Sequence, residues 1–234
     1  MRNGFKVFDT DTHLESSAET MERYFDAAMR KRQPELERLK EPMRVSSSGT
    51  VPASGKHQYR LPGRVSYQRI LGQAGPAASA VRNLGRFNGT VTPAQGAADD
   101  QPAARIRDMD REGVDVHLML PGIPSNVFAT HDLGLELGLI RAQHRLLDDF
   151  CGRYPRRLKS LIIVSADAIG PCVDEIRRWG AAPWAVGVWP VTMDTPIDHP
   201  DFEPVWRACA DYDLCVVYHG YTWNPPYFPG HREI

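Results

Sequence analysis

Within the first forty residues, an apolar segment is followed abruptly by a polar one. Phe5 and two further β-formers lie within 5–10, and a polar run, 9–13, closes the stretch, which predicts a buried strand over 5–10 that ends in polar residues. Residues 17–39 are rich in Glu, Arg, Met and Ala, as is typical of helix, and Pro34 predicts an interruption. The chain therefore opens with a strand followed by helix.

The segment 42–98 has little periodicity and many Gly, Pro and Ser residues, which predicts a long irregular insertion. Structureless stretches of this length inside a compact domain are usually functional lids or disordered. The insertion contains no Asp or Glu but has seven basic residues: Arg44, Lys56, Arg60, Arg64, Arg69, Arg82 and Arg86.

From residue 103 onward, helical and short apolar segments alternate. The pattern predicts helices over 103–112, 132–154, 171–180 and 201–211, and strands over 114–120, 158–164, 185–191 and 214–218. Such alternation favours a parallel sheet with right-handed crossovers, and strands that are apolar without alternation indicate burial on both faces. Two architectures fit five parallel strands: a doubly wound open sheet and a (β/α) barrel, which needs eight strands.

Composition narrows the class of protein. The chain has 42% hydrophobic residues and a net charge of -1, so it has neither the composition of a disordered protein nor an overall charge suited to nucleic acid or anionic membranes. It lacks a signal peptide and an apolar run of membrane-spanning length, which predicts a cytoplasmic protein. Because no CxxC pair occurs, we expect reduced core thiols at all four cysteines: Cys151, Cys172, Cys209 and Cys215.

Two of the predicted strands end in potential metal ligands. Asp11 and His13 follow the first strand, and His219 follows the fifth. Ligands at i and i+2 of an extended chain point to the same side, and the carboxyl ends of parallel strands lie at one edge of the sheet. A lone histidine at a strand end is more often structural, but this combination favours a single divalent ion, Zn²⁺ or Mn²⁺.

The run 7–15, with Asp11-Thr12-His13 at its centre, resembles the opening strand of the amidohydrolase-related family, in the branch of aminocarboxymuconate semialdehyde decarboxylase and resorcylate decarboxylase. Residues 108–115, 201–206 and 217–220 agree with that resemblance. It implies a (β/α)8 TIM barrel in which an acidic variant of an HxH motif and His219 bind one metal ion. Residues 1–234 would then form the N-terminal part of one such domain, with about five of its eight strands and the insertion 42–98.

The family also uses a histidine after strand six and a proton-transferring aspartate after strand eight. The chain does not reach either strand, and His231 follows His219 too closely to replace the histidine. The resemblance therefore implies a truncated barrel whose catalytic acid or base is not assigned.

A basic insertion near the barrel mouth favours a small anionic substrate bearing a carboxylate. The aromatic residues Tyr221 and Trp223 follow His219 and suit a wall for a flat substrate. Together with the resemblance, these features favour nonoxidative decarboxylation.

Three alternatives remain open. The first is a metal-dependent amide or lactone hydrolase. The second is an inactive, truncated barrel whose unpaired strand edges invite association, a homo-oligomer included. The third is a haloacid-dehalogenase-like phosphatase, because Asp9 and Asp11 follow a strand as its nucleophile and acid do.

Overall fold

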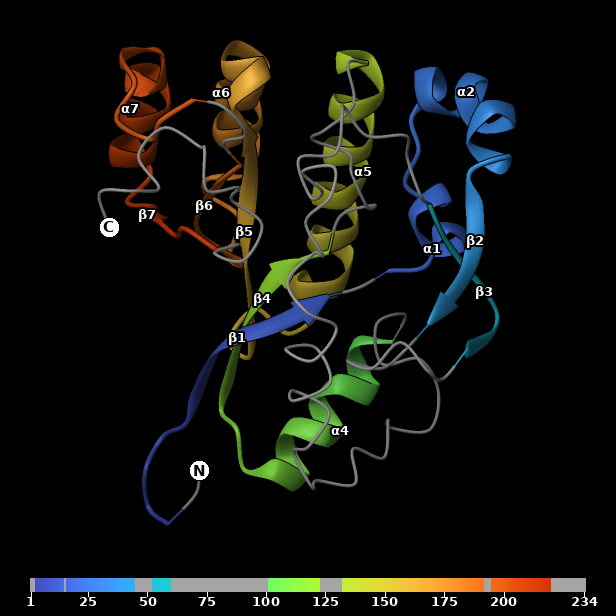
Figure 1. Cartoon of the computed structure of the whole chain (residues 1–234). Coiled ribbons are helices and arrows are strands. Elements are labelled where there is room, and N and C mark those ends of the chain that lie inside the picture. The colour runs from blue at the N-terminus through green and yellow to red at the C-terminus, as the bar shows by residue number, and fades with distance from the viewer. Residues whose placement is uncertain are drawn as a thin grey trace, which may run out of the picture.

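The computed structural model describes residues 3–14, 16–44, 52–59, 101–122, 132–191 and 195–219. Its main feature is a parallel sheet with strand order β1-β4-β5-β6-β7, whose strands are β1 (Phe8–Leu14), β4 (Val116–Pro121), β5 (Leu158–Ser165), β6 (Ala185–Val191) and β7 (Cys215–Val216) (Figure 1). This 5-stranded sheet confirms the predicted strand number and direction. The order follows the sequence without the reversal of a doubly wound sheet, which leaves the barrel-type arrangement.

Strand β1 lies further along the chain than predicted. It spans Phe8–Leu14 rather than 5–10, because His13 and Leu14 pair with β4 at Leu120 and Pro121. The pairing offset changes between Asp9 and Thr12, where β1 contains one extra residue. Asp11 and His13 therefore belong to the strand instead of following it, and the prediction of a buried strand was wrong because most of the side chains of β1 are exposed.

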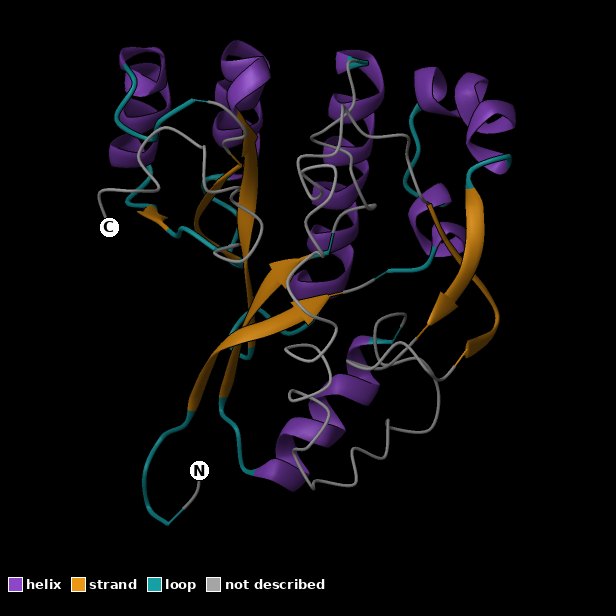
Figure 2. Cartoon of the chain, in the orientation of Figure 1, coloured by secondary structure: helices purple, strands orange, loops and turns teal. Residues whose placement is uncertain are grey.

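The helices lie around this sheet (Figure 2): α1 (Ala18–Glu22), α2 (Ala27–Glu37), α4 (Pro102–Glu112), α5 (Leu133–Gly152), α6 (Ile169–Trp179) and α7 (Glu203–Asp211), with short 3₁₀ turns η2 (Ala166–Ala168) and η3 (Pro200–Phe202). The four helices from α4 onward agree with the prediction to within a few residues. Their ends have local causes: Gly113, at φ 76°, closes α4 in the left-handed region, and the Asp132 carboxylate accepts the Leu135 N–H at 2.9 Å to begin α5.

The helical segment 17–39 breaks elsewhere than predicted. Helix α1 ends before residue 23, and Asp26 starts α2 by accepting the Met29 N–H through its carboxylate at 2.9 Å. Pro34 lies inside α2 without ending it. A proline removes one backbone hydrogen bond, whereas the capping carboxylate and the buried Phe25 define the actual break.

The insertion is regular where it is described. Strands β2 (Lys40–Arg44) and β3 (Pro52–Tyr59) form an antiparallel pair, so the prediction of irregular chain was wrong for these residues. Side chains of α1 bind this pair: the Glu22 carboxylate accepts from Tyr59 Oη and lies 2.8 Å from Lys40 Nζ. Residues 45–51 and 60–98 lie outside the described residues, and with them most of the basic side chains expected near the substrate.

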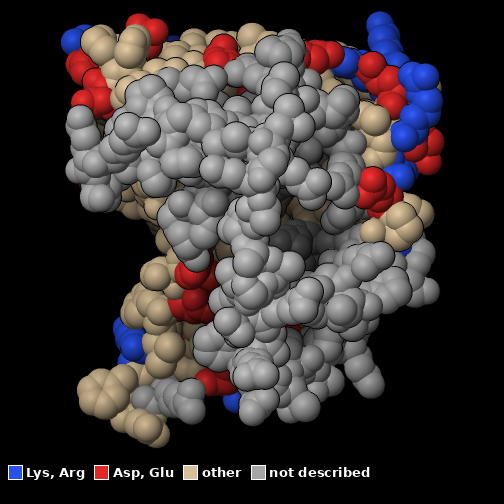
Figure 3. Space-filling view, viewed as in Figure 1, with Lys and Arg blue, Asp and Glu red and all other residues tan. Residues whose placement is uncertain are grey.

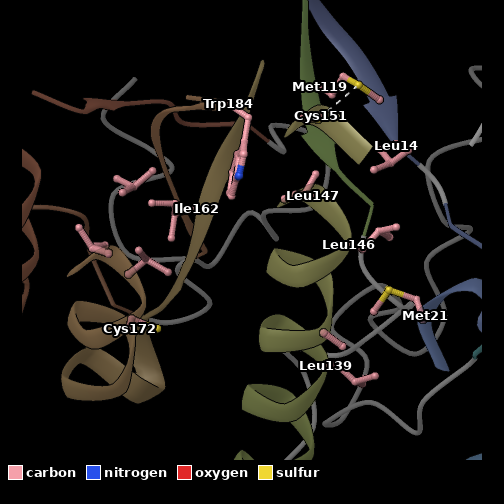
Figure 4. Packing of buried hydrophobic residues seen from close by; sticks show 14 of the residues in the cluster. Leu14, Met21, Met119, Leu139, Leu146, Leu147, Cys151, Ile162, Cys172 and Trp184 are labelled. Atoms are coloured by element: carbon pink, nitrogen blue, oxygen red, sulfur yellow. Dashed lines mark hydrogen bonds between the residues drawn. The ribbon is translucent and has the colours of Figure 1, made fainter. Parts of the chain in front are cut away.

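The hydrophobic core lies between the sheet and helices α1, α2, α5, α6 and α7, with β5 almost wholly buried at its centre (Figure 4). Leu147 of α5, Ile162 of β5 and Trp184 are fully buried there. Four free cysteines agree with the prediction of reduced thiols: Cys151, Cys172 and Cys209 are buried, but Cys215 is exposed, so its assignment to the core was wrong.

The described surface carries charges of both signs, which fits the small net charge. Figure 3 shows basic and acidic side chains intermixed at the upper right, over α2. None of the helices in the described ranges has the length and apolarity needed to cross a bilayer.

Candidate metal centre

Asp11 and His13 lie near the carboxyl end of β1 and alternate with Thr12 and Leu14 along the strand. Leu14 is fully buried in the core, whereas His13 is exposed. Because successive side chains of a strand point to opposite faces, the core holds the strand through Leu14 while His13 and Asp11 face away from it.

His219 lies just beyond β7 and is positioned by β6. The Val217 N–H donates to the Val188 carbonyl at 2.9 Å, which continues the pairing of the two strands past Val216. The Trp189 indole Nε1–H donates to the His219 carbonyl at 3.2 Å, and the two rings lie edge to face with centroids 6.1 Å apart. Two contacts from β6 therefore hold this histidine.

The side chains of Asp11, His13 and His219 converge. His219 Nε2 lies 3.1 Å from Asp11 Oδ1, and the two histidine rings are 5.2 Å apart between centroids. One ligand atom from each residue lies within 4.8 Å of the others. Ligand atoms bound to one Zn²⁺ or Mn²⁺ are about 3 to 4 Å apart, so small side-chain movements would complete the set. The predicted convergence is confirmed.

The sheet must curve for this meeting to occur. Strands β1 and β7 are the outermost strands of the described sheet, separated by three others. In a flat sheet they would be about 19 Å apart, since neighbouring strands are spaced by about 4.8 Å. The 3.1 Å contact between Asp11 and His219 shows that the sheet bends round, as the wall of a barrel does.

A second polar group lies next to this centre. Asp9 Oδ1 accepts the Asp11 N–H at 3.1 Å, and Asp9 Oδ2 lies 3.9 Å from His117 Nε2 on β4. His117 is buried, and its ring nitrogens have no hydrogen-bond partner among the described residues. Burial lowers the pKa of His117, nearby Arg105 lowers it further, and Asp9 opposes both. Sequence reasoning gave this histidine no role, and only the β1–β4 register places it beside Asp9.

Arg105 of α4 also contacts the strand that carries Asp11 and His13. Its Nη1 donates to Thr12 Oγ1 at 3.0 Å, and its Nη2 donates to the His13 carbonyl at 2.9 Å. No sequence signal indicated this contact, because Arg105 and Thr12 are 93 positions apart. Tyr221 and Trp223, predicted to bind substrate, lie outside the described residues, as does His231.

Neither a protein-family model nor a curated protein sequence matches the chain. Solved structures do. An amidohydrolase from Mycobacterium avium subsp. paratuberculosis has a TM-score of 0.60 at 19% identity, over 94% of this chain and 60% of its own. A 5-carboxyvanillate decarboxylase from Novosphingobium aromaticivorans, with bound manganese and 3-methoxy-4-hydroxy-5-nitrobenzoic acid, has a TM-score of 0.54 at 20% identity, over 99% of this chain and 56% of its own.

A third similar structure is the 5-carboxyvanillate decarboxylase of Sphingomonas paucimobilis, with a TM-score of 0.53 at 20% identity over 92% of this chain. The chain spans between 51% and 60% of the lengths of these three proteins. The similarity confirms the predicted fold: the described five-stranded parallel sheet corresponds to part of a (β/α) barrel.

Proposed function

We propose that this chain carries the metal centre of an amidohydrolase-related enzyme that decarboxylates a small carboxylate substrate without oxidation. The observation that supports it is the convergence of Asp11, His13 and His219, whose ligand atoms lie within 4.8 Å at the carboxyl edge of a parallel sheet. Barrel enzymes place their chemistry at this edge.

The donor set fits a divalent ion. One carboxylate and two imidazoles are ligands that Zn²⁺ and Mn²⁺ both accept, so Asp11, His13 and His219 would hold the metal. Such an ion supplies Lewis acidity that binds and polarises an oxygen of the substrate. Bound manganese in a similar solved structure supports a divalent ion, and the identity of the metal is part of the proposal.

The residues around the centre orient the ligands and leave one side accessible. The Asp11 side chain is 72% exposed and that of His219 is 25% exposed, so a substrate in solution can reach the site. Trp189 holds the His219 backbone, and Asp9 accepts the Asp11 N–H. We assign the carboxylate of the substrate to this open side.

Nonoxidative decarboxylation also needs a group that protonates the carbon losing CO₂. None of the described residues is assigned to that step, so the proposal gives the chain metal binding and substrate orientation. The aromatic acid bound in the Novosphingobium decarboxylase is compatible with a flat, anionic substrate.

Metal binding by the purified chain tests the first part of the proposal. Titration with Mn²⁺ and with Zn²⁺, followed by calorimetry and metal analysis, should show one ion per chain. His219→Ala should abolish that binding, whereas His199→Ala should preserve it, because His199 lies in an exposed turn beside Asp201. Equal binding by the His219→Ala variant would refute the assigned centre.

Turnover tests the second part. The metal-loaded chain, and the same chain with His219→Ala, are incubated with aromatic and muconate-type acids and followed for CO₂ release. Amides and lactones are followed for hydrolysis in parallel. CO₂ release that depends on His219 supports decarboxylation, hydrolysis alone replaces it with the amidohydrolase alternative, and metal binding without turnover assigns the chain to metal binding only.

A further inference from the structure

We infer that Arg105 is a positioning residue of the metal centre: its guanidinium holds the end of β1 so that Asp11 and His13 face the ion together. This inference rests on the proposed function, because it concerns the same centre. Arg105 itself does not ligate the metal, and it acts through the strand that carries two of the ligands.

The contacts of Arg105 fall on the backbone and side chain between those ligands. Nη1 donates to Thr12 Oγ1 at 3.0 Å and Nη2 donates to the His13 carbonyl at 2.9 Å. Thr12 separates Asp11 from His13, so one planar group binds both the linking residue and the second ligand. A guanidinium presents its N–H donors in a rigid fork, which suits such two-point binding.

The direction of the His13 carbonyl makes it accessible to this donor. The Leu14 carbonyl accepts the Gly122 N–H at 2.7 Å and so points toward β4. Neighbouring carbonyls of a strand point to opposite sides, so the His13 carbonyl points away from β4, toward the edge of the described sheet. Arg105 therefore takes the place that a neighbouring strand has elsewhere in the ladder.

Arg105 also comes from an element that shares the β1 partner strand. Helix α4 leads through Gly113 into β4, which pairs with β1 at Thr12 and His13. The strand end is thus held from two directions, by β4 through the backbone and by α4 through Arg105. Groups that orient metal ligands in this way typically contribute about 10- to 100-fold to metal affinity.

Charge and position predict opposite results when Arg105 is replaced. A cation beside a cation site repels the ion, so by charge alone Arg105→Met would bind metal more tightly. If Arg105 orients the ligands, the same variant binds more weakly. The sign of the change therefore separates the two roles.

The test measures Mn²⁺ dissociation constants and the electron paramagnetic resonance spectrum of bound Mn²⁺ for the full chain and its variants. Arg105→Met should weaken binding by about 10- to 100-fold and change the spectrum at saturating Mn²⁺. Arg105→Lys keeps the charge but loses the forked pair of donors, so its Mn²⁺ affinity should lie between that of the parent chain and that of Arg105→Met. Thr12→Val should weaken Mn²⁺ binding by about 2- to 10-fold.

Arg107→Met is the matched control, because Arg107 is an exposed arginine on the same helix. Its affinity and spectrum should equal those of the parent. If Arg105→Met unfolds, Arg105→Lys and Thr12→Val decide the question instead.

Unchanged or tighter binding by the folded Arg105 variants would overturn the inference while leaving the metal centre in place. A lower melting temperature with an unchanged affinity and spectrum would do the same, since Arg105 would then only stabilise the fold. Failure of the parent chain itself to bind Mn²⁺ or Zn²⁺ would overturn the proposed function, and this inference with it.

Discussion

Two of the histidine–carboxylate pairs among the described residues lie in opposite settings. His219 and Asp11 meet at the exposed edge of the sheet, 3.1 Å apart, with His13 beside them. His144 and Glu175 meet in the core between α5 and α6, 2.7 Å apart and shielded from solvent.

The difference lies in how many partners each group already has. The His144 ring is satisfied at both nitrogens, since Nδ1 binds Glu175 and Nε2 accepts the Ile163 N–H at 2.9 Å. Glu175 also accepts from the Trp179 indole at 3.0 Å. Such a closed network has no capacity left for a ligand, whereas the exposed Asp11 carboxylate and the adjacent His13 do. Residue type alone does not make a site; accessible ligand atoms that can form a further bond do.

The largest effect is expected in the core pair. His144→Ala should lower the free energy of unfolding by about 3 to 5 kcal/mol, because it empties a buried ring site and removes the hydrogen bonds that the ring makes with Glu175 and with the Ile163 N–H. Urea unfolding measures this, and Mn²⁺ affinity, taken on the folded fraction, should not change. His199→Ala, at a surface pair, should shift stability by about 0.5 kcal/mol or less. A small loss in His144→Ala would mean that the pair is not a fixed part of the core.

The exposed pair should respond in the opposite way. Asp11→Asn keeps the shape but removes the charge, and should weaken Mn²⁺ binding by more than about 100-fold, beyond the effect of an orienting group. Its stability without metal should stay within about 0.5 kcal/mol of the parent. Glu175→Gln makes the same chemical change in the core pair. It should lower the free energy of unfolding and leave the Mn²⁺ affinity unchanged. Similar results from the two variants would erase the distinction between the pairs.

Acid should act on the core pair through proton binding. Burial lowers the pKa of His144, and the Ile163 N–H already occupies Nε2, so the folded chain keeps this ring neutral. The unfolded chain binds the proton below about pH 6.5, so stability is complete above that pH and falls below it, by at most about 1.4 kcal/mol per pH unit.

Glu175 extends the same trend to lower pH. Burial raises its pKa and is the largest single influence, but His144, the Trp179 hydrogen bond and the charge of Arg141 together outweigh burial and leave the pKa below its ordinary value. Its contribution is present above about pH 4.5 and is lost as the pH falls further. Urea unfolding between pH 4 and 8 measures the His144 contribution and the onset of the Glu175 contribution, and a His144→Gln variant should show a flatter profile from about pH 6.5 downward. Equal profiles would contradict the assignment of the effect to this ring.

The smallest effect is expected at Trp189. Trp189→Phe keeps an aromatic ring beside His219 but removes the indole N–H that donates to the His219 carbonyl. Mn²⁺ affinity should fall by about 2- to 10-fold, the range of one ordinary hydrogen bond. Trp206→Phe is the control for the loss of an indole, because Trp206 of α7 stacks on Phe202 and not on His219. A loss of Mn²⁺ affinity as large as that of Asp11→Asn would contradict this supporting role of Trp189.

Elements with local causes were predictable from the sequence. The bounds of β6 agree with the prediction, and the ends of α4 and α5 follow from Gly113 and Asp132, whose capping chemistry is visible in the sequence. The convergence of Asp11, His13 and His219 was also predictable, because parallel strands bring their carboxyl ends to one edge.

Features that depend on contacts between distant segments were not predictable. The extent of β1 depends on its register with β4, and the β2–β3 pair depends on Glu19 and Glu22 of α1, which bind His57 and Tyr59. Arg105 is one of many arginines in the sequence, and only the packing of α4 selects it. Patterns along the chain carry no information of this kind.

The curvature of the sheet has a consequence for folding. Asp11 and His219 are separated by 208 positions, yet they would bind one ion. A metal bound to both would cross-link the two outermost strands, and in the chain-entropy model of a cross-link a closed loop of this length is worth about 5 kcal/mol. The unfolded chain holds these ligands far apart, so it would bind the ion weakly, and the cation would act as a clasp that closes only after all five strands have assembled.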